Sequence, residues 1–497
     1  MTTTVERPHG SIGAEAGGSV DSRRWLALAI IAVAQLMIVL DASIVNIAMP
    51  KAQTDLHISV ADRQWIVTAY TLAFGGLLLL GGRIADFIGR KRAFVGGLLG
   101  FATASAIGGL APDASFLFAA RALQGAFAAV LAPAALSLIT VTFTETRERA
   151  RAFGVYGAIA GGGAALGLIL GGVLTEYTSW RWCLLVNVPI ALLTAAAALP
   201  IVRESRAEGK ARYDIPGTLT VTAGLVSLVY GFTKAAEDGW SSAVTLGFLA
   251  AAGALLVGFV IVEARSAAPL LPLRVVWERN RGASFLSSLL IGGGLFAMFL
   301  FLTFYFQVSL GYSALRTGFA FLPFSAGIIV SAGLASQLMP RTGPKVPMVV
   351  GTVLTVVGLF TLTQIGLDTS YVSHVLPGEL LMSIGLGLIF VPMSSLALIG
   401  VEPHDAGVAS ALVNATQQVG GSLGTALLNT VFATAVTNYV IDHGASPQST
   451  AQAQISGYTT AFVWGAVLIL LALATIVVLV RAGKDEVPAQ AGAVHAG

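Results

Sequence analysis

Long apolar runs separated by short polar stretches dominate this chain. Each run has about 20 residues, enough for a helix to cross a hydrocarbon core of about 30 Å. We count fourteen, at residues 26–48, 64–82, 93–111, 115–139, 152–174, 183–201, 215–233, 242–262, 284–307, 318–338, 346–366, 375–398, 408–434 and 458–480. Because a helix satisfies its own backbone hydrogen bonds in lipid, the pattern predicts an all-α integral membrane protein with fourteen transmembrane helices.

The overall composition excludes most other classes of protein. Of 497 residues, 56% are hydrophobic and only 11% are charged, and the mean hydropathy is +0.82. Soluble domains carry about 25% charged residues. The net charge of +3 is small, and the basic residues are spread over many loops, so no nucleic-acid partner is predicted.

Lysine and arginine fall mainly in alternate loops. If both termini are cytoplasmic, the inner segments contain 21 of the 28 Lys and Arg residues and the outer loops contain 5, while Arg83 and Arg121 lie within the runs. Short cytoplasmic loops retain positive charge, so this asymmetry predicts an even number of spans. The residues before Trp25 lack a signal-peptide pattern, so the first span stays in the protein. We therefore expect a multi-pass protein of the cell membrane with both termini in the cytoplasm.

A faint internal repeat predicts two six-helix halves. Its three echoes, each in the same order, pair Gly82-x-x-x-Asp86 with Gly333-x-x-x-Gln337, Leu123 to Pro133 with Met382 to Pro392, and Gly163-x-x-x-Gly167 with Gly420-x-x-x-Gly424. Transporters are often built from such repeats. The predicted organisation is a cytoplasmic tail at 1–24, an N-terminal half at 25–202, cytoplasmic linkers with two extra helices at 203–282, a C-terminal half at 283–481 and a cytoplasmic tail at 482–497.

Several motifs, taken in order and spacing, resemble the major facilitator superfamily and, within it, the fourteen-span drug:proton antiporters. The resemblance covers about Gln35 to Trp464. It is carried by the fifth-run glycines and by Leu40-Asp41-Ala-Ser-Ile-Val-Asn46, Gly82 to Arg92, Arg121-Ala-Leu-Gln-Gly125, Trp180-Arg-Trp182 with Asn187-Val-Pro189, Gly311-Tyr-Ser-Ala-Leu-Arg-Thr-Gly318 and Asn414-Ala-Thr-Gln-Gln418. The resemblance implies a multidrug efflux transporter that works by alternating access.

Asp41 is the strongest candidate for proton coupling. A carboxylate at mid-membrane costs on the order of 2.5–3.5 kcal/mol, so it is rarely kept without a partner or a task. Asp41 and Arg121 each lie about six or seven residues from the outer ends of their predicted helices, roughly 10 Å deep, so they can pair. The resemblance favours a proton carrier at Asp41 with Arg121 as its partner; a purely structural ion pair is the alternative. Glu379 is a second candidate, either a proton or cation site or a solvated helix end.

The charged loop after the second run is the candidate conformational switch, formed by Gly82, Asp86, Gly89, Arg90 and Lys91. Asp86 can pair with Arg90 or Lys91 in one conformation and release it in another. The alternative is that the basic residues only set orientation. Similar antiporters carry an arginine directly after the aspartate, where this chain has Phe87, so we expect Arg90 to be the partner.

Glycines in the fifth run match the antiporter glycine motif at Gly154, Gly163, Gly167 and Gly171. The last three recur every four residues and make a flat stripe that another helix can approach. The resemblance implies that this stripe seals the two halves against leakage, although Leu168 replaces the usual proline. Generic small-residue packing is the alternative.

Polar groups within the runs are expected to face protein or a water-filled cavity, because lipid offers them no partner. They are Gln35, Asn46, Gln124, Asn187, Gln307, Glu379, Asn414, Gln417 and Gln418. From these and from the aromatic residues, we predict a substrate cavity lined by Gln35, Tyr70, Tyr156, Tyr305, Asn414, Gln417 and Gln418. For any single aromatic residue, plain packing is the alternative.

The chain shows no sign of an ATP site, a metal site or a cofactor. Gly209-Lys210 and Gly483-Lys484 are not followed by Ser or Thr, so a phosphate-binding loop is absent, and Cys183 is the only cysteine. The predicted function is proton-coupled export of bulky hydrophobic compounds, such as drugs, dyes and antibiotics, with no obligate protein partner. A dedicated exporter or uptake carrier of one metabolite or siderophore, and a membrane enzyme, are the alternatives.

Overall fold

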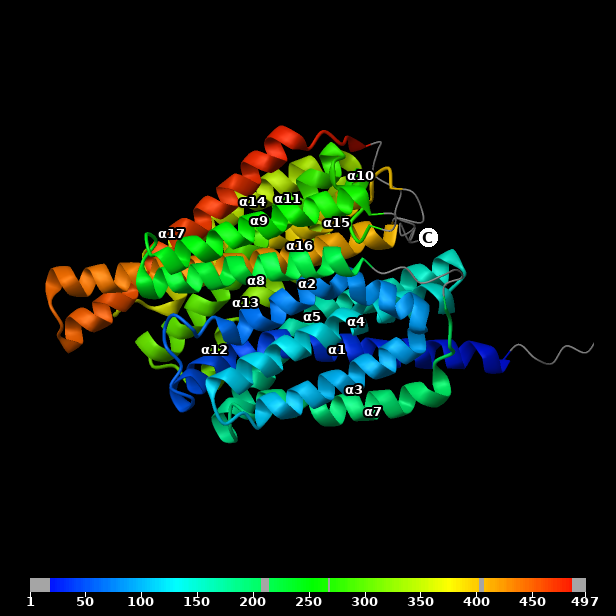
Figure 1. The fold of residues 1–497 in the computed structure, drawn as a ribbon, viewed down its shortest axis with the longest axis horizontal. Helices are drawn as coiled ribbons and strands as arrows, with labels where there is room; N and C mark the ends of the chain where they lie inside the picture. Colours follow the sequence, from blue (N-terminus) through cyan, green and yellow to red (C-terminus); the bar gives the residue numbers. More distant parts are fainter. Residues whose placement is uncertain (1–17, 207–213, 267–268, 402–405, 485–497) are drawn as a thin grey trace, which may run out of the picture.

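The computed structural model describes residues 18–206, 214–266, 269–401 and 406–484, which form a bundle of helices without a strand in those ranges (Figure 1). Most of the two predicted tails lies outside them. The helices are α1 (Gly18–Asp55), α2 (Trp65–Ile88), α3 (Arg90–Gly109), α4 (Ala114–Thr142), α5 (Thr146–Tyr177), α6 (Trp182–Leu185), α7 (Asn187–Ile201), α8 (Ile215–Asp238), α9 (Ala243–Arg265), α10 (Leu273–Val276), α11 (Arg279–Phe304), α12 (Ala314–Ala320), α13 (Leu322–Thr342), α14 (Lys345–Leu362), α15 (Leu376–Leu398), α16 (Ala406–His443) and α17 (Pro447–Leu479), with π-helical turns η1 (Tyr305–Ser309) and η2 (Tyr371–Val375).

Twelve helical segments of the described chain are long and apolar enough to cross a membrane, which confirms a multi-pass helical protein. They correspond to twelve of the fourteen predicted spans. The other two predicted spans are the helices α3 and α5. α3 begins with three basic residues, and in α5 the continuous apolar stretch of described residues is Gly162–Tyr177. Both helices pack within the bundle, α3 against α4 and α5 against α1.

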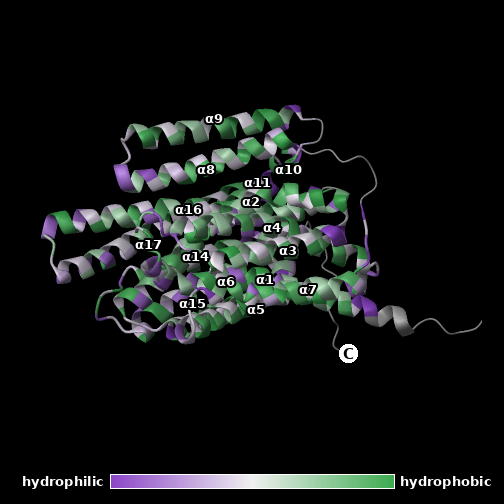
Figure 2. Cartoon of the chain, turned by 60° about the horizontal axis from the view of Figure 1, so that its bottom comes forward, coloured by the Kyte–Doolittle hydropathy of each residue, from purple (hydrophilic) through white to green (hydrophobic). Residues whose placement is uncertain are grey.

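The helices form two groups by their contacts, and the two predicted halves stay a prediction. On one side α1 packs on α5 and α7, while α2 and α3 pack on α4; on the other side α11 packs on α16 and α17, while α13 and α14 pack on α15. α2 meets α16, and α5 meets α12, between these groups. The α8–α9 pair lies at the edge of the bundle, where α8 contacts α2 and α16 (Figure 2).

Matching contacts recur in the two groups. Lys91 donates from Nζ to the Leu199 carbonyl at 2.5 Å, near the end of α7, and Lys345 donates likewise to the Val477 carbonyl at 2.8 Å, near the end of α17. In each group the loop after the second helix is thus tied to the end of the last helix. The two loops therefore make equivalent contacts in the two groups.

The hairpin of α16 and α17 is longer than expected. From hydropathy, the thirteenth span was predicted to end at residue 434 and the fourteenth to begin at residue 458. In the structure, α16 continues to His443 and α17 begins at Pro447. This hairpin projects beyond the rest of the bundle (Figure 1). Ser446 caps α17 with a reciprocal hydrogen-bonded box to Ser449. Polar residues can continue a helix that has left the membrane, so an apolar window underestimates its length.

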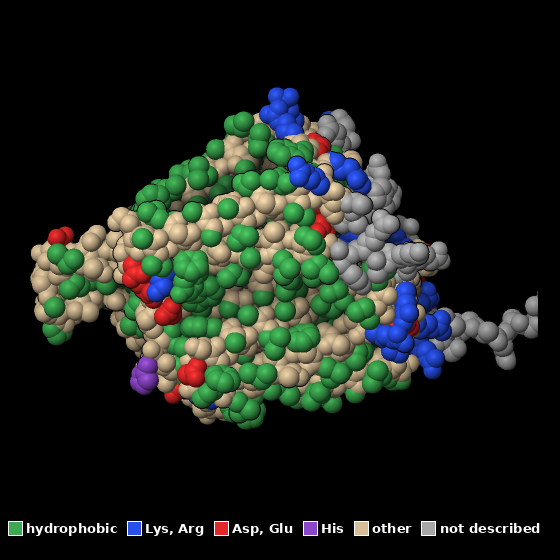
Figure 3. All heavy atoms as spheres, in the orientation of Figure 1, with side chains coloured by type: hydrophobic (Ala, Val, Ile, Leu, Met, Phe, Trp, Pro, Cys, Tyr) green, Lys and Arg blue, Asp and Glu red, His purple; other side chains and the backbone are tan. Residues whose placement is uncertain are grey.

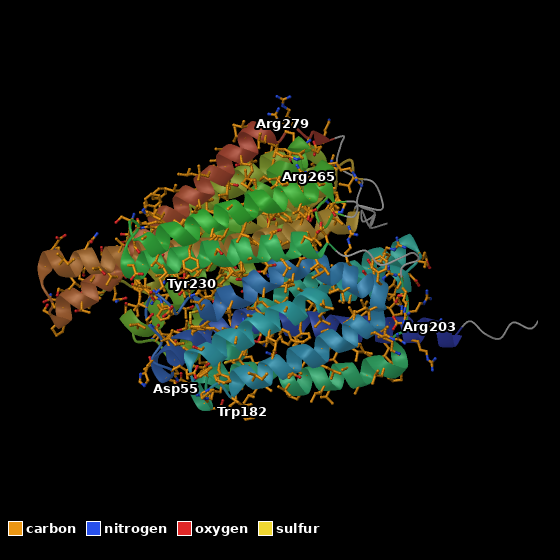
Figure 4. The ribbon with its side chains drawn as sticks, in the orientation of Figure 1. Asp55, Trp182, Arg203, Tyr230, Arg265 and Arg279 are labelled. Carbon is orange, nitrogen blue, oxygen red and sulfur yellow. The ribbon has the colours of Figure 1, made fainter. Side chains whose placement is uncertain are left out.

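The two ends of the bundle differ in charge. Lys and Arg side chains gather toward the right-hand end of the view in Figure 3. Arg203, Arg265 and Arg279 lie toward that end, whereas Asp55 and Trp182 lie toward the other (Figure 4). We call the end with Asp55 and Trp182 the Asp55 end, and the opposite end the basic end.

Candidate functional site

Asp41 and Arg121 form an ion pair inside the bundle. Arg121 Nη1 donates to Asp41 Oδ2 at 2.7 Å, and the two side chains are 1% and 0% exposed. Asp41 Oδ1 accepts from Asn187 Nδ2 at 2.8 Å and from Gln124 Nε2 at 3.1 Å. Every group that contacts the carboxylate is a hydrogen-bond donor, so both oxygens of Asp41 act as acceptors.

Arg121 also joins this site to the first turn of α2. Its Nε donates to the Ile66 carbonyl at 3.0 Å, and its guanidinium lies 4.4 Å from the centre of the Tyr70 ring. Movement of Arg121 would therefore act directly on the start of α2. Tyr70, predicted to line a cavity, is instead buried against the ion pair.

Three neutral residues complete the site, and the sequence assigned none of them to it. Gln124 Nε2 also donates to Ser105 Oγ at 2.6 Å, so α3 contributes as well as α1, α4 and α7. The sequence marks Gln124 and Asn187 only as polar groups within spans. The position of Gln124, three residues after Arg121 on one helix face, was the available signal; Ser105 gave none.

Glu379 lies apart from this site, in the first turn of α15. Its side chain is fully buried, so its interpretation as a solvated helix end is wrong. Tyr371 donates to Glu379 Oε2 at 3.1 Å and also approaches the Ala320 carbonyl, while Glu379 Oε1 has no hydrogen-bond partner. When the two repeats are aligned at Pro133 and Pro392, Glu379 corresponds to Ala120, the residue before Arg121.

The charged loop after α2 is held in one conformation. Arg90 donates to Asp86 Oδ1 from Nη2 at 2.9 Å and from Nε at 3.0 Å. Lys91 instead reaches Leu199, as described above, so the structure pairs Asp86 with Arg90 and not with Lys91. A Cβ added at Gly82 would make an ordinary van der Waals contact with Pro133 of α4.

Glu204 clamps this loop, which the sequence did not indicate. Its carboxylate accepts from the backbone N–H groups of Lys91 and Arg92, at 3.1 and 3.3 Å, and so caps the N-terminus of α3. Gly89 has φ of 117°, and a Cβ there would lie 2.6 Å from Glu204 Oε1. Glycine is required at this position both for the backbone conformation and for the approach of Glu204.

The glycine stripe packs α5 against α1, within one half. The atoms nearest to Cβ atoms added at Gly163, Gly167 and Gly171 all belong to α1, whereas Gly154 is exposed with nothing within 4 Å. The stripe thus faces α1 in this state, and its role as a seal between the halves stays a prediction. Close approaches between the two groups occur at Gly318 of α12, whose Cβ position lies 2.5 Å from the Leu168 carbonyl, and at Gly172 of α5, whose Cβ position lies 2.6 Å from Leu315 Cα.

Replacing Gly167 by alanine should destabilise the protein. A Cβ at Gly167 would lie 1.9 Å from Ser43 Oγ and 3.0 Å from the Leu40 carbonyl, so α1 and α5 must separate. Overpacking of this kind costs about 1–3 kcal/mol, and we expect Gly167→Ala to melt several degrees lower in detergent. Gly154→Ala is the matched control and should not lower the melting temperature. Equal melting of the two variants would show that the stripe is not a close contact.

The predicted cavity residues do not form one cluster. Tyr156 donates to Gln35 Oε1 at 2.6 Å, which links α5 to α1. Tyr305 lies elsewhere, in an aromatic core with Phe306 and Tyr458, and its hydroxyl contacts the Gly366 carbonyl at 2.9 Å. The remaining three residues lie on α16. Gln417 and Gln418 are half-buried there, and Asn414 is exposed.

Six hydrogen bonds join described residues of the two halves, and all lie from the middle of the bundle toward the Asp55 end. Arg63, predicted only as an outer-loop charge, is 2% exposed and donates from Nε to Asn429 Oδ1 at 3.1 Å. Asn429 donates in turn to the carbonyls of Val60 and Ala61. The other three bonds are Thr71 with Ser422 at 2.6 Å, Gln307 to the Ile47 carbonyl at 2.9 Å and Ala314 N–H to Glu176 at 3.1 Å.

Two aromatic rings enclose the Arg63 guanidinium. Its central carbon lies 4.1 Å from the Phe304 ring centre and 4.6 Å from that of Phe432. Burial lowers the pKa of Arg63 to about 10, so the side chain stays protonated at neutral pH. Arg63 therefore acts as a buried cation between the halves.

Comparisons with known proteins agree with this architecture. Residues 31–425 match the family model described as Major Facilitator Superfamily. The chain is 51% identical to the puromycin resistance protein of Streptomyces alboniger, over 91% of this chain and 90% of that protein. It is 39% identical to the cephamycin export protein of Amycolatopsis lactamdurans, over 96% of each.

A solved structure shows the same fold. The crystal structure of an auto-inhibited POT family peptide transporter superposes with a TM-score of 0.66 at 16% identity, over 94% of this chain and 99% of that one. The identity is too low to transfer more than the fold. The match over most of the chain, together with the two close relatives, shows that this protein belongs to the major facilitator superfamily.

Proposed function

We propose that this protein exports bulky hydrophobic compounds from the cytoplasm in exchange for protons, by alternating access. The observation that carries the proposal is the fully buried Asp41, held by donors from Arg121, Gln124 and Asn187. An ionisable group buried in a transport protein is by default a functional site. The relatives named for puromycin resistance and cephamycin export support small antibiotics as the substrate class.

Protonation of Asp41 supplies the step that couples protons to movement. A neutral carboxyl group loses its ion pair with Arg121 and turns an O–H toward groups that are themselves donors. Arg121 is then free to shift from the Ile66 carbonyl, which it contacts at 3.0 Å, and so to release the first turn of α2. Each proton carried inward yields about 2.3 kcal/mol per 100 mV of membrane potential.

The hydrogen bonds around Arg63 close the Asp55 end in the state described here. We infer that this end is extracellular and that the basic end, with the Asp86–Arg90 pair, is cytoplasmic. The fourteen predicted spans fit this orientation, with α3 and α5 as the third and fifth spans, both termini inside, and the halves at 25–202 and 283–481. In the opposite state the contacts near Arg63 open and the basic end closes.

Glu379 is proposed as a second proton site, in the C-terminal half. Its carboxyl group is buried, and one oxygen is without a partner, so the neutral form suits this environment better than the charged form. The Gln35–Tyr156 pair and the three polar residues of α16 are proposed as separate contacts for substrate.

Efflux in cells tests the proposal. A drug-sensitive host that expresses the protein should accumulate less of a fluorescent hydrophobic cation and less puromycin than the same host without it. An uncoupler that collapses the proton gradient should abolish the difference. Low accumulation that persists without the gradient would contradict proton-coupled export. Resistance confined to one compound would instead favour a dedicated exporter on the same fold.

A further inference from the structure

Two buried carboxylates face each other at the basic end of the α8–α9 pair. Asp214 precedes α8 and Glu263 lies in the last turn of α9, and their side chains are only 6% and 3% exposed. A Cβ at Gly217 would lie 2.7 Å from Glu263 Oε1 and 3.0 Å from Asp214 Oδ1. Both carboxylates therefore approach the same point at the start of α8, where glycine leaves room for them.

Each carboxylate uses one oxygen and leaves the other unpaired. Asp214 Oδ1 accepts from the Gly217 N–H at 2.8 Å, and Glu263 Oε2 accepts from the Leu271 N–H at 2.9 Å. Asp214 Oδ2 and Glu263 Oε1 are buried and have no hydrogen-bond partner. A buried carboxylate oxygen without a donor is costly when the group is ionised.

In the described part of the chain, the charges around the pair do not balance two negative groups. Arg83 of α2 reaches the segment after α9, where its Nη2 donates to the Pro269 carbonyl at 2.7 Å, and its positive charge acts on Glu263. Arg265, two residues after Glu263, is exposed. α16 also packs on α8, but its described titratable groups Tyr439, Asp442 and His443 lie at the opposite end. Among the residues that the structure describes, one cation therefore acts on two carboxylates.

We propose that Asp214 and Glu263 bind one proton between them and form a protonation site at the base of the two extra helices. Two carboxylates close together ionise in separate steps, so one retains its proton when the other is charged. With the proton bound, one negative charge remains and Arg83 balances it. The site then holds the α8–α9 pair and the following segment against α2, next to the loop of Asp86. Because it concerns the resting protein, this proposal stands or falls independently of proton-coupled export.

Infrared spectroscopy of the full chain in lipid nanodiscs, without substrate or gradient, tests the site. The carbonyl stretch of a protonated carboxyl group is distinct from that of a carboxylate. We expect Glu263→Gln and Asp214→Asn each to remove the signal of one protonated carboxyl at pH 7, and the double variant to remove no more. Asp442→Asn, on the exposed hairpin, is the control and should remove none. These variants are near-isosteric with the protonated acids, and their folding is checked by thermal melting.

Metal ions provide the second arm of the experiment. Wild-type protein should melt at the same temperature in sodium, potassium or magnesium chloride at equal ionic strength. Loss of one signal in each single variant, with no ion-specific melting shift, supports the shared proton. An unchanged signal in either single variant overturns it. A shift with one metal ion that disappears in the double variant also overturns it, and identifies a metal cation as the ligand of the two carboxylates.

Discussion

Asp41→Asn should abolish gradient-driven export. An amide cannot release a proton, and its NH₂ group meets Asn187 and Gln124, which also donate, so Arg121 is left buried without its ion pair. Removing one partner of a buried ion pair costs about 3–5 kcal/mol. We expect uphill efflux of dye from proteoliposomes with an imposed pH gradient to fall to the level of empty liposomes.

Two controls separate coupling from folding. Asp55→Asn changes a half-exposed aspartate at the Asp55 end, whose partner Arg181 lies at 3.2 Å, and should leave efflux unchanged. Asp41→Asn itself should still bind substrate and allow downhill movement that no longer responds to pH. If Asp41→Asn retained full efflux that an uncoupler abolishes, Asp41 would not be the proton carrier.

The Asp41–Arg121 pair could be predicted from the sequence because lipid leaves few options. Two opposite charges at similar depth in apolar helices must find partners, and depth follows from helix length. Asn187 could not be assigned in the same way, because a neutral polar residue near a helix end is equally satisfied by water. Its role depends on how α7 packs against α1, which hydropathy does not encode.

The contacts between halves were the least predictable part of the site. Arg63 falls in a polar stretch between two spans, where a positive charge usually faces water. Its burial depends on Phe304 and Phe432 from the other half, residues that read in sequence as ordinary apolar positions. The glycine stripe shows the same limit. Its flat surface was predictable from the four-residue spacing, but its partner, α1, was not.

Arg63→Ala should open the Asp55 end. Arg63 contributes a hydrogen bond to Asn429 and two aromatic contacts, all between the halves. Desolvated cation–π contacts contribute about 2 kcal/mol, so their loss should shift the balance between the closed and open states by about 30-fold. Because Arg121 contacts Ile66, three residues away, the variant should also weaken the link between Asp41 and this interface.

Thiol labelling measures the opening. Thr71 is 1% exposed between the halves, so Thr71→Cys in a Cys183→Ser background reports access from the Asp55 end. A membrane-impermeant maleimide should label this cysteine at least about tenfold faster when Arg63→Ala is present, in line with the expected population shift. Arg181→Ala, whose contacts lie within the N-terminal half, is the matched control and should not change the rate.

The pH dependence of labelling gives an independent check of the cation. The pKa of Arg63 is lowered from 12.5 to about 10 because burial disfavours its charged form. At pH 6–8 the side chain is fully protonated, so its hold on Asn429 and the two rings should be constant there and should weaken only as pH rises through about 10. Any change in labelling between pH 6 and 8 must then come from another group, and Asp41→Asn should remove it if that group is Asp41. Equal labelling with and without Arg63 across this range would show that the Asp55 end is closed by its helices alone.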